Sequence, residues 1–366
     1  MDEYFVQVLS NMGVISFIAL SAYLILVTGE ISFGQQSYFA ISAYASGIAT
    51  AMWNWNFIFG MMFGILCAGV VAFFVAWPTL RLRGLYFSIA SLALGELTRL
   101  LFENFHYQIE IDGELIGPQG SEGFRGIRYI FEADISAFSF MLIIYGFLAV
   151  VLTALFIMER TRLGYIFRML GDDELLAETQ GINRIFYKVL ATILAAILAG
   201  IGGALYAHMN TYIEPKIFNV MLGIHGLAYG LIGGLGTAFG PLIGVIIDIG
   251  ILESIRVFSG YRMVIFGLLV AVLLIIKPRG LLDEAFVRRI KSFRGLLKKN
   301  VFRGGGREPL VTLVLRPPPK PPKTMINRFF ELLAASKSFW SRLGAAGIDL
   351  GCQGMVLAAQ SSLQDA

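Results

Sequence analysis

Four acidic residues lie within or at the ends of long uncharged runs of this sequence and are the first candidates for chemistry: Glu30, Glu96, Asp248 and Glu253. Arg99 and Arg256 each follow one of these acids by three residues, a spacing at which two side chains on a helix can form an ion pair. Asp248 lies deep in an apolar run and has no obvious partner. A buried acid of this kind is a candidate for proton coupling, but a proton-coupled carrier would usually contain more of them.

The sequence contains no motif that points to catalysis or to a metal site. It lacks the G-x-x-x-x-G-K-[ST] pattern with which a P-loop binds nucleotide. His106, His208 and His225 are scattered, without metal-ligand spacing, and Cys67 and Cys352 are too far apart to suggest a disulfide framework. We therefore expect no catalytic residue, no metal and no cofactor in this chain.

His225 lies in a glycine-rich apolar run, where packing against a neighbouring helix is favoured over a role in a pore.

Residues 159–188 form the longest charge-rich interruption between the apolar runs. This stretch contains five bases, and Lys and Arg accumulate in short cytoplasmic loops of membrane proteins: Arg160, Arg162, Arg168, Arg184 and Lys188. Its middle part reads as a short helix of about ten residues that ends at Gly181. Asp172 or Asp173 can cap the N-terminus of this helix, where the carboxylates of Asp173 and Glu174 are also favourable.

The predicted helix has an apolar stripe of Leu175, Leu176 and Thr179, with Ala177 close to it. A helix this short, between two membrane crossings, cannot bury such a face by itself. The pattern therefore predicts that another protein covers the stripe. A plain connecting loop with one helical turn fits the same spacing.

The composition identifies an integral membrane protein. Of the 366 residues, 57% are hydrophobic and only 15% are charged, whereas ordinary soluble domains contain about 45–50% apolar residues. The uncharged runs are continuous and about twenty residues long, which is the length that a helix needs to cross a membrane. They lack the alternation of barrel strands. The net charge of +4 is modest and does not require a nucleic acid partner.

The runs predict an all-α, polytopic membrane helix bundle with about 8–10 transmembrane helices, some of them interrupted by glycine. We expect nine crossings with the N-terminus outside, at residues 4–27, 31–52, 57–77, 84–102, 135–158, 189–210, 220–235, 239–252 and 263–276. Residues 31–52 contain several glycines and serines and read as an interrupted span or as two half-helices. With this count every basic loop lies on the cytoplasmic side.

Two segments differ in charge from the rest of the chain. The loop at residues 103–134 contains seven acids and two arginines, so we expect it on the external side. Residues 1–282 form the predicted transmembrane domain, and residues 283–366 form a basic, proline-rich cytoplasmic extension that we expect to be disordered. Its bases suit contact with anionic membrane lipid. A docking site for a partner is the alternative.

Glycines crowd the predicted hairpin at residues 220–252. Broken helices can line a substrate path, because freed backbone groups are tolerated where they face protein or a water-filled cavity. Tight helix packing explains the same glycines equally well. The candidates for a substrate path come from this hairpin and from the start of the second run: Gly34, Gln35, Tyr38, Gly226, Gly230, Gly233 and Gly234.

Several motifs together resemble a known family. They are ISFGQQSYFAISAYASG at 31–47, PTLRLRGLYFSIASLALGELTRLLFEN at 78–104, GPQGSEGFRGI at 117–127, the stretch at 159–188, and GLIGGLGTAFGPLIG at 230–244 followed by KPRGLL at 277–282. In this order they are similar to the permease subunit of branched-chain amino acid ABC transporters. The resemblance covers residues 14–282. The extension after residue 282 has no counterpart in the family pattern, and the N-terminus is one span shorter than in many members.

The resemblance implies a multi-pass protein of the cell inner membrane that imports leucine, isoleucine or valine. Its implied partners are a second homologous permease, an external solute-binding protein and two cytoplasmic ATPase subunits, which use the ATP. The family uses the loop matching 159–188 as a coupling helix that docks on the ATPase. The implied contact residues are Arg168, Asp173, Glu174, Leu175, Ala177, Glu178 and Gly181. The alternatives are an ABC permease for another small solute such as urea, an amide or a sugar, a stand-alone secondary transporter, and a non-transporting membrane scaffold.

Overall fold

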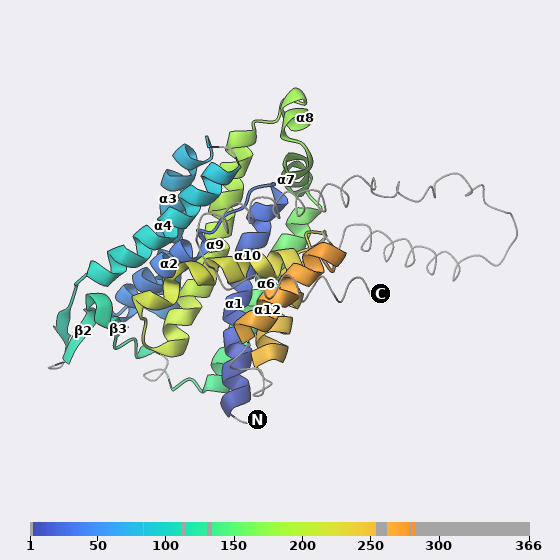
Figure 1. The fold of residues 1–366 in the computed structure, drawn as a ribbon. Helices are drawn as coiled ribbons and strands as arrows, with labels where there is room; N and C mark the ends of the chain where they lie inside the picture. Colours follow the sequence, from blue (N-terminus) through green and yellow to red (C-terminus); the bar gives the residue numbers. More distant parts are fainter. Residues whose placement is uncertain are drawn as a thin grey trace, which may run out of the picture. The chain divides into compact units, whose positions relative to one another are not determined.

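The computed structural model describes residues 3–82, 84–111, 114–129, 134–253, 262–277 and 280–282. The chain divides into two compact units, Met1–Lys299 and Asn300–Ala366, and all of the described residues belong to the first. That unit is a bundle of helices with one small sheet (Figure 1). The predicted extension at 283–366 and Arg256, the predicted partner of Glu253, lie outside the described residues.

Five helices are long and apolar enough to cross a membrane: α1 (Glu3–Val27), α3 (Phe57–Thr79), α4 (Leu85–Asn104), α6 (Ala137–Glu159) and α9 (Arg184–Asn210). A helix rises about 1.5 Å per residue, so about twenty residues cover a hydrocarbon core of about 30 Å. Large apolar side chains on α3, including Phe59, Leu66 and Phe74, are exposed, as expected of a face that meets lipid. The all-α membrane bundle is thus confirmed.

The remaining apolar helices are shorter: α2 (Gln35–Ala51), α10 (Val220–Gly233), α11 (Gly240–Val245), the π-helical segment η3 (Ile246–Glu253) and α12 (Arg262–Ile276). A helix of 14 residues such as α10 extends only about 21 Å, which is less than the thickness of a hydrocarbon core of about 30 Å. The count of nine crossings therefore stays a prediction.

The start of the second predicted span differs from the expectation. Residues 31–34 have no regular secondary structure, and α2 then continues without a break from Gln35 to Ala51. The prediction of two half-helices within 31–52 is wrong, because the interruption lies before the helix and not inside it. Helix α2 is also almost completely buried, unlike a helix on the outside of a bundle.

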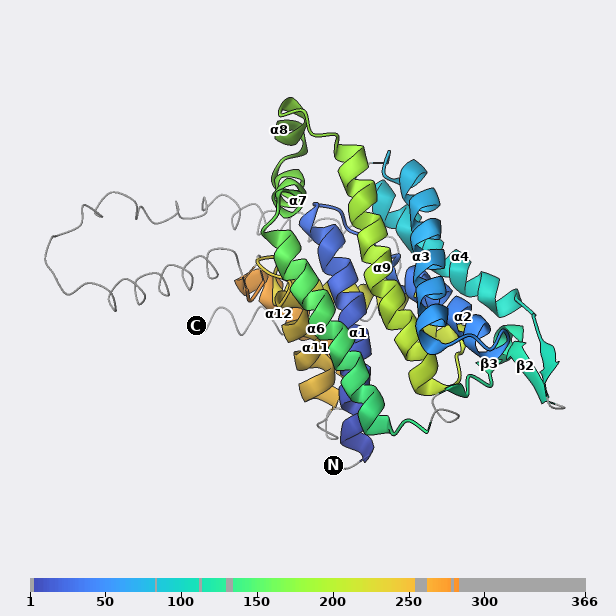
Figure 2. The same cartoon turned by 180° about the vertical axis from the view of Figure 1, so that it is seen from behind.

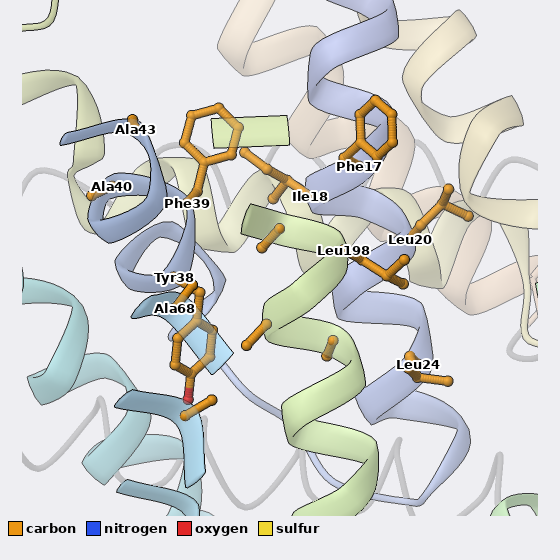
Figure 3. Close-up of a cluster of buried hydrophobic side chains, with 14 of the residues drawn as sticks. Phe17, Ile18, Leu20, Leu24, Tyr38, Phe39, Ala40, Ala43, Ala68 and Leu198 are labelled. Atoms are coloured by element: carbon orange, nitrogen blue, oxygen red, sulfur yellow. The ribbon is translucent and has the colours of Figure 1, made fainter. Parts of the chain in front are cut away.

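The core forms around α9, which packs against α1, α2 and α3. Figure 3 shows Phe17 and Ile18 of α1, Phe39 of α2 and Leu198 of α9 in this cluster, and all four side chains are buried. Two glycines let the backbones meet. A Cβ at Gly203 of α9 would overlap the carbonyl of Phe39, and a Cβ at Gly64 of α3 would lie 2.6 Å from the Ser42 carbonyl oxygen. Small residues commonly serve this purpose in membrane helices.

The segment at 103–134 is folded and not merely a loop. It contains β1 (Ile109–Ile111), β2 (Glu114–Pro118), the 3-10 turn η1 (Gly120–Glu122) and β3 (Phe124–Arg125), in an antiparallel sheet of order β1-β2-β3. Phe124 and Ile127 are completely buried. The backbone of Phe124 exchanges hydrogen bonds of 2.8 and 3.0 Å with Ile213, which precedes the 3-10 turn η2 (Pro215–Phe218). Sequence patterning did not predict this sheet.

Helices α7 (Arg162–Asp172) and α8 (Glu174–Thr179) lie at the end of the bundle opposite the sheet. Figures 1 and 2 show this separation from two sides. The long helix α9 connects the two ends. Near its start, Arg184 pairs with Glu178 of α8, and just after its end the Thr211 carbonyl accepts a hydrogen bond from Ile127.

Candidate functional site

Helix α8 has the cap and the stop that the sequence predicts. The Asp173 carboxylate accepts hydrogen bonds from the backbone N–H groups of Leu175 (2.9 Å) and Leu176 (3.1 Å), which satisfies two free donors at the helix start. Gly181 has a φ of +81° and ends the helix, with Ile182 N–H donating to the Ala177 carbonyl as in a Schellman motif. The helix has six residues, fewer than the predicted ten.

Helix α7, which precedes α8, was missed. The sequence indicates it through Leu163, Phe167 and Leu170, which recur at the helical spacing of four and three residues. Phe167 and Leu170 are buried in the structure. The bases and glycines of this stretch obscure the pattern, so it reads as a loop.

The two leucines of α8 are its free apolar surface. Leu175 is 67% exposed and Leu176 is 54% exposed, whereas Ala177 is completely buried. Leu176 therefore belongs with the candidate contacts although the predicted set omits it, and the Ala177 side chain faces the chain itself. We call Leu175 and Leu176 the leucine pair.

A buried group of charges attaches α8 to the bundle. Lys188, in the second turn of α9, is 4% exposed, and its Nζ lies 2.6 Å from Glu30 Oε1 and also contacts Glu174 of α8. Arg184, one turn earlier, pairs with Glu178 at 2.9 Å. Sequence analysis placed Lys188 in a loop and Glu30 alone at a span end. Because α9 begins at residue 184 and not 189, the lysine lies inside the bundle.

A second attachment joins α6 and α7 to the turn between α10 and α11. Arg168 donates hydrogen bonds to the carbonyls of Leu235 (3.4 Å) and Gly236 (3.0 Å). Glu159 Oε1 accepts from Tyr23 Oη at 2.6 Å and from the backbone N–H of Ala238 at 2.8 Å. Arg168 was predicted as an ATPase contact, but these bonds direct its guanidinium toward the glycine-rich turn.

A third attachment is a close approach of two backbones. A Cβ at Gly171 of α7 would overlap the Val27 carbonyl of α1, and one at Gly29 would lie 3.1 Å from Gly171 Cα. Gly29 also has a φ of +82°, which favours glycine. Helices α7 and α8 are therefore fixed to α1, to α9 and to the α10–α11 turn.

The predicted glycines of the α10–α11 hairpin pack tightly. A Cβ at Gly226 would lie 2.7 Å from Ile18 Cγ2, and one at Gly230 would lie 2.9 Å from Leu26 Cδ1, so these two glycines let α10 approach α1. A Cβ at Gly233 would overlap the Gly240 carbonyl, and Gly234 has a φ of +92°. Packing accounts for these residues, and their role in a substrate path stays a prediction.

The predicted residues at the start of α2 are buried. Polar side-chain atoms at this helix start lack a hydrogen-bond partner among the described residues. Gly34 is the N-cap, and Gln35 and Tyr38 are 0% and 3% exposed. Within the described part of the chain, neither the amide nitrogen nor the amide oxygen of Gln35 has a hydrogen-bond partner, and the same holds for Gln36, which was not among the predicted residues. Burying a polar group without a partner costs about 1–3 kcal/mol, so two adjacent glutamines of this kind require an explanation.

Asp248 is not isolated, contrary to the expectation. Its Oδ2 accepts a hydrogen bond of 2.6 Å from Tyr229 Oη, and the carboxylate is buried. His225 packs against the rings of Tyr229 and Phe266, which agrees with the packing interpretation of this histidine.

The predicted pairing of Glu96 with Arg99 is confirmed by a 3.0 Å hydrogen bond. Among the described residues no three His, Cys, Asp or Glu side chains cluster as metal ligands would.

Comparison with known proteins places these features in a family context. A family model described as "Branched-chain amino acid transport system / permease component" matches residues 4–277. The high-affinity branched-chain amino acid transport system permease protein LivM of Escherichia coli K12 is 28% identical over 305 residues, which cover 76% of this chain and 68% of the relative. The LivM protein of Salmonella typhimurium LT2 is 27% identical over the same shares.

A third relative has a different name. The nucleoside ABC transporter permease protein NupC of Lactococcus lactis subsp. cremoris MG1363 is 26% identical over 251 residues, which cover 63% of this chain and 75% of the relative. No solved structure matches the chain.

Proposed function

Because the chain belongs to the family of branched-chain amino acid transport system permease components, we propose that it is the membrane-spanning subunit of an ABC importer for leucine, isoleucine and valine. It resides in the cell inner membrane. Separate cytoplasmic ATPase subunits drive the cycle, a second homologous permease completes the membrane part, and an external binding protein delivers the amino acid.

The observation that carries this proposal is the leucine pair. Two large apolar side chains are exposed on a capped helix at the end of the bundle, and an isolated helix of six residues would not be stable in water. Glu174 and Arg168 attach α7 and α8 to the bundle. Through these attachments, a force applied to α8 would be transmitted to the helices of the bundle. An ATPase that covers the leucine pair would move those helices by rigid-body motion.

The test replaces the leucine pair by acids. In a reconstituted complex with the binding protein and the ATPases, Leu175→Glu with Leu176→Glu should reduce ATP-driven leucine uptake at least about tenfold, because two charges would be buried at the interface. Leu115→Glu makes the same change at a residue of β2 that is also 67% exposed, and should leave uptake unchanged. Wild-type uptake by the double variant would refute the role of α8.

This variant is more specific than a charge reversal at Glu174 and Glu178. These two acids pair with Lys188 and Arg184, so reversing them would also detach α8 from α9. Replacing the leucine pair breaks neither of these ion pairs.

A nucleoside is the second candidate substrate, because one relative is a nucleoside permease. A competition experiment distinguishes leucine from a nucleoside as the substrate. Unlabelled leucine should block uptake of labelled leucine by the wild-type complex, and unlabelled uridine should not. Uptake of uridine in preference to leucine would assign the nucleoside instead.

A further inference from the structure

Helix α2 begins inside the bundle. The side chain of Gln36, in its first turn, lies against Gly95, which is in the middle of α4 (Leu85–Asn104). The first N–H groups of a helix lack intrahelical partners and carry a partial positive charge. The N-cap residue Gly34 offers no side-chain cap to them. A helix start at this depth is a typical place for an anionic group of a substrate in a membrane transporter.

The glutamines at this helix start are the second, independent observation. Gln35 and Gln36 are completely buried, and none of the described residues forms a hydrogen bond with their amide groups. The hydroxyl of Ser37, the next residue, is in the same condition. A buried amide that is left unpaired in the protein alone is explained if a ligand pairs with it during the working cycle.

The Gln36 amide lies between α4 and α10, close to a glycine of each helix. A Cβ at Gly95 of α4 would overlap Gln36 Nε2, and a Cβ at Gly223 of α10 would overlap Gln36 Oε1. The same Cβ at Gly223 would lie 2.7 Å from the Phe33 carbonyl oxygen. The Gln36 amide and the Phe33 carbonyl therefore lie close together at the N-terminus of α2, and α10 packs against both.

The segment before α2 is held at fixed points. Ser88 Oγ donates to the Ile31 carbonyl at 2.7 Å, and Ser91 Oγ accepts from Phe33 N–H at 3.0 Å. The residue before this segment is Glu30, which pairs with Lys188 and through it with α8. A shift of α8 would thus reach the start of α2.

We propose that the start of α2, with Gln35, Gln36 and the Phe33 carbonyl, binds the ammonium and carboxylate groups of the transported amino acid when α4 and α10 separate. This assignment rests on the proposed function. The carboxylate would accept hydrogen bonds from the helix N–H groups and the amide nitrogens. The ammonium would donate to the amide oxygens and to the carbonyl. These groups carry no formal charge, which suits a zwitterion with no net charge.

The test separates uptake from ATP hydrolysis in the complete reconstituted complex. Gln36→Met keeps the length of the side chain and removes its amide. Leucine uptake should fall at least about tenfold, while hydrolysis stimulated by the binding protein stays within about twofold of wild type. Gln119→Met makes the same change at an exposed residue near β2 and should alter neither rate.

A second variant guards against a folding defect. Gln35→Met leaves Gln36 and its contacts with Gly95 and Gly223 in place, and should show the same loss of uptake with hydrolysis retained. Unchanged uptake in both variants, or a proportional loss of uptake and hydrolysis, would overturn the assignment. A wild-type complex that takes up no leucine would contradict the proposed function instead.

Discussion

At the residue scale, the ion pair of Lys188 with Glu30 is a deeply buried contact between distant parts of the chain. Their side chains are 5% and 7% exposed. Burying each charge costs much desolvation, and this cost is offset only while the opposite charge is present. Glu174 adds a second carboxylate from α8. The pair therefore fixes the start of α9 and the first part of the α1–α2 connection relative to each other.

Replacing Lys188 by methionine should lower the free energy of unfolding by about 3–5 kcal/mol, because Glu30 would remain buried without a countercharge. Denaturant unfolding of the purified protein in detergent measures this loss. Lys216→Met is the control, since that lysine is 66% exposed beside Glu214 and should matter by less than about 1 kcal/mol. Adding Glu30→Gln to Lys188→Met should recover part of the loss. Equal effects of the two lysine variants would contradict the account.

Sequence spacing predicts contacts between residues of one helix but not between helices. The pair of Glu96 and Arg99 was evident, since three residues separate them on α4. The partner of Asp248 was not, although Tyr229 is only 19 residues away, because the turn between α10 and α11 brings the two together. The same reason hid the pairing of Lys188 with Glu30, which are 158 residues apart.

At the scale of elements, glycines decide which helices touch. Helix α2 meets α9 at Gly203, where the Phe39 carbonyl occupies the space of a side chain. In contrast, no atom of another described residue lies within 4 Å of the place where Gly146 of α6 would carry a Cβ. Both glycines are inside long helices, so they form a matched pair.

Gly203→Ala should destabilise the protein by at least about 1–3 kcal/mol, because a methyl group forces the backbones of α2 and α9 apart. Gly146→Ala should be neutral or stabilising by up to about 1 kcal/mol, since alanine is the better helix former in open space. Thermal unfolding of both variants in the same detergent compares them. A larger loss in Gly146→Ala would show that the packing of α2 on α9 is described wrongly.

The length and hydropathy of the long helices made them predictable, whereas segments with mixed patterns were not. Helices α1, α3, α4 and α6 begin and end within a few residues of the predicted spans. Helix α7 was missed because two arginines and two glycines lie among its apolar residues and make its period unclear. The sheet of β1, β2 and β3 was missed because its strands have only two to five residues, too few for a clear period.

At the scale of the whole described bundle, two different surfaces lie at opposite ends. One end has the sheet, and the other has α8 with its leucine pair (Figure 2). Motifs spread over residues 31–282 were enough to predict the family, which the match to residues 4–277 confirms. The coupling role of α8 and the substrate contacts at α2 depend on partners and ligands, so they stay proposals.

The most direct test of the account asks what covers α8. In a chain with Cys67 and Cys352 replaced by alanine, Leu176→Cys should form a cross-link to the ATPase subunit of the assembled complex with a short thiol-reactive cross-linker. Leu115→Cys, at the opposite end, should not. Two results would contradict the claim that the ATPase covers α8. One is labelling of the Leu176→Cys variant by an impermeant thiol reagent from the external side, and the other is no cross-link to the ATPase in a complex that transports leucine.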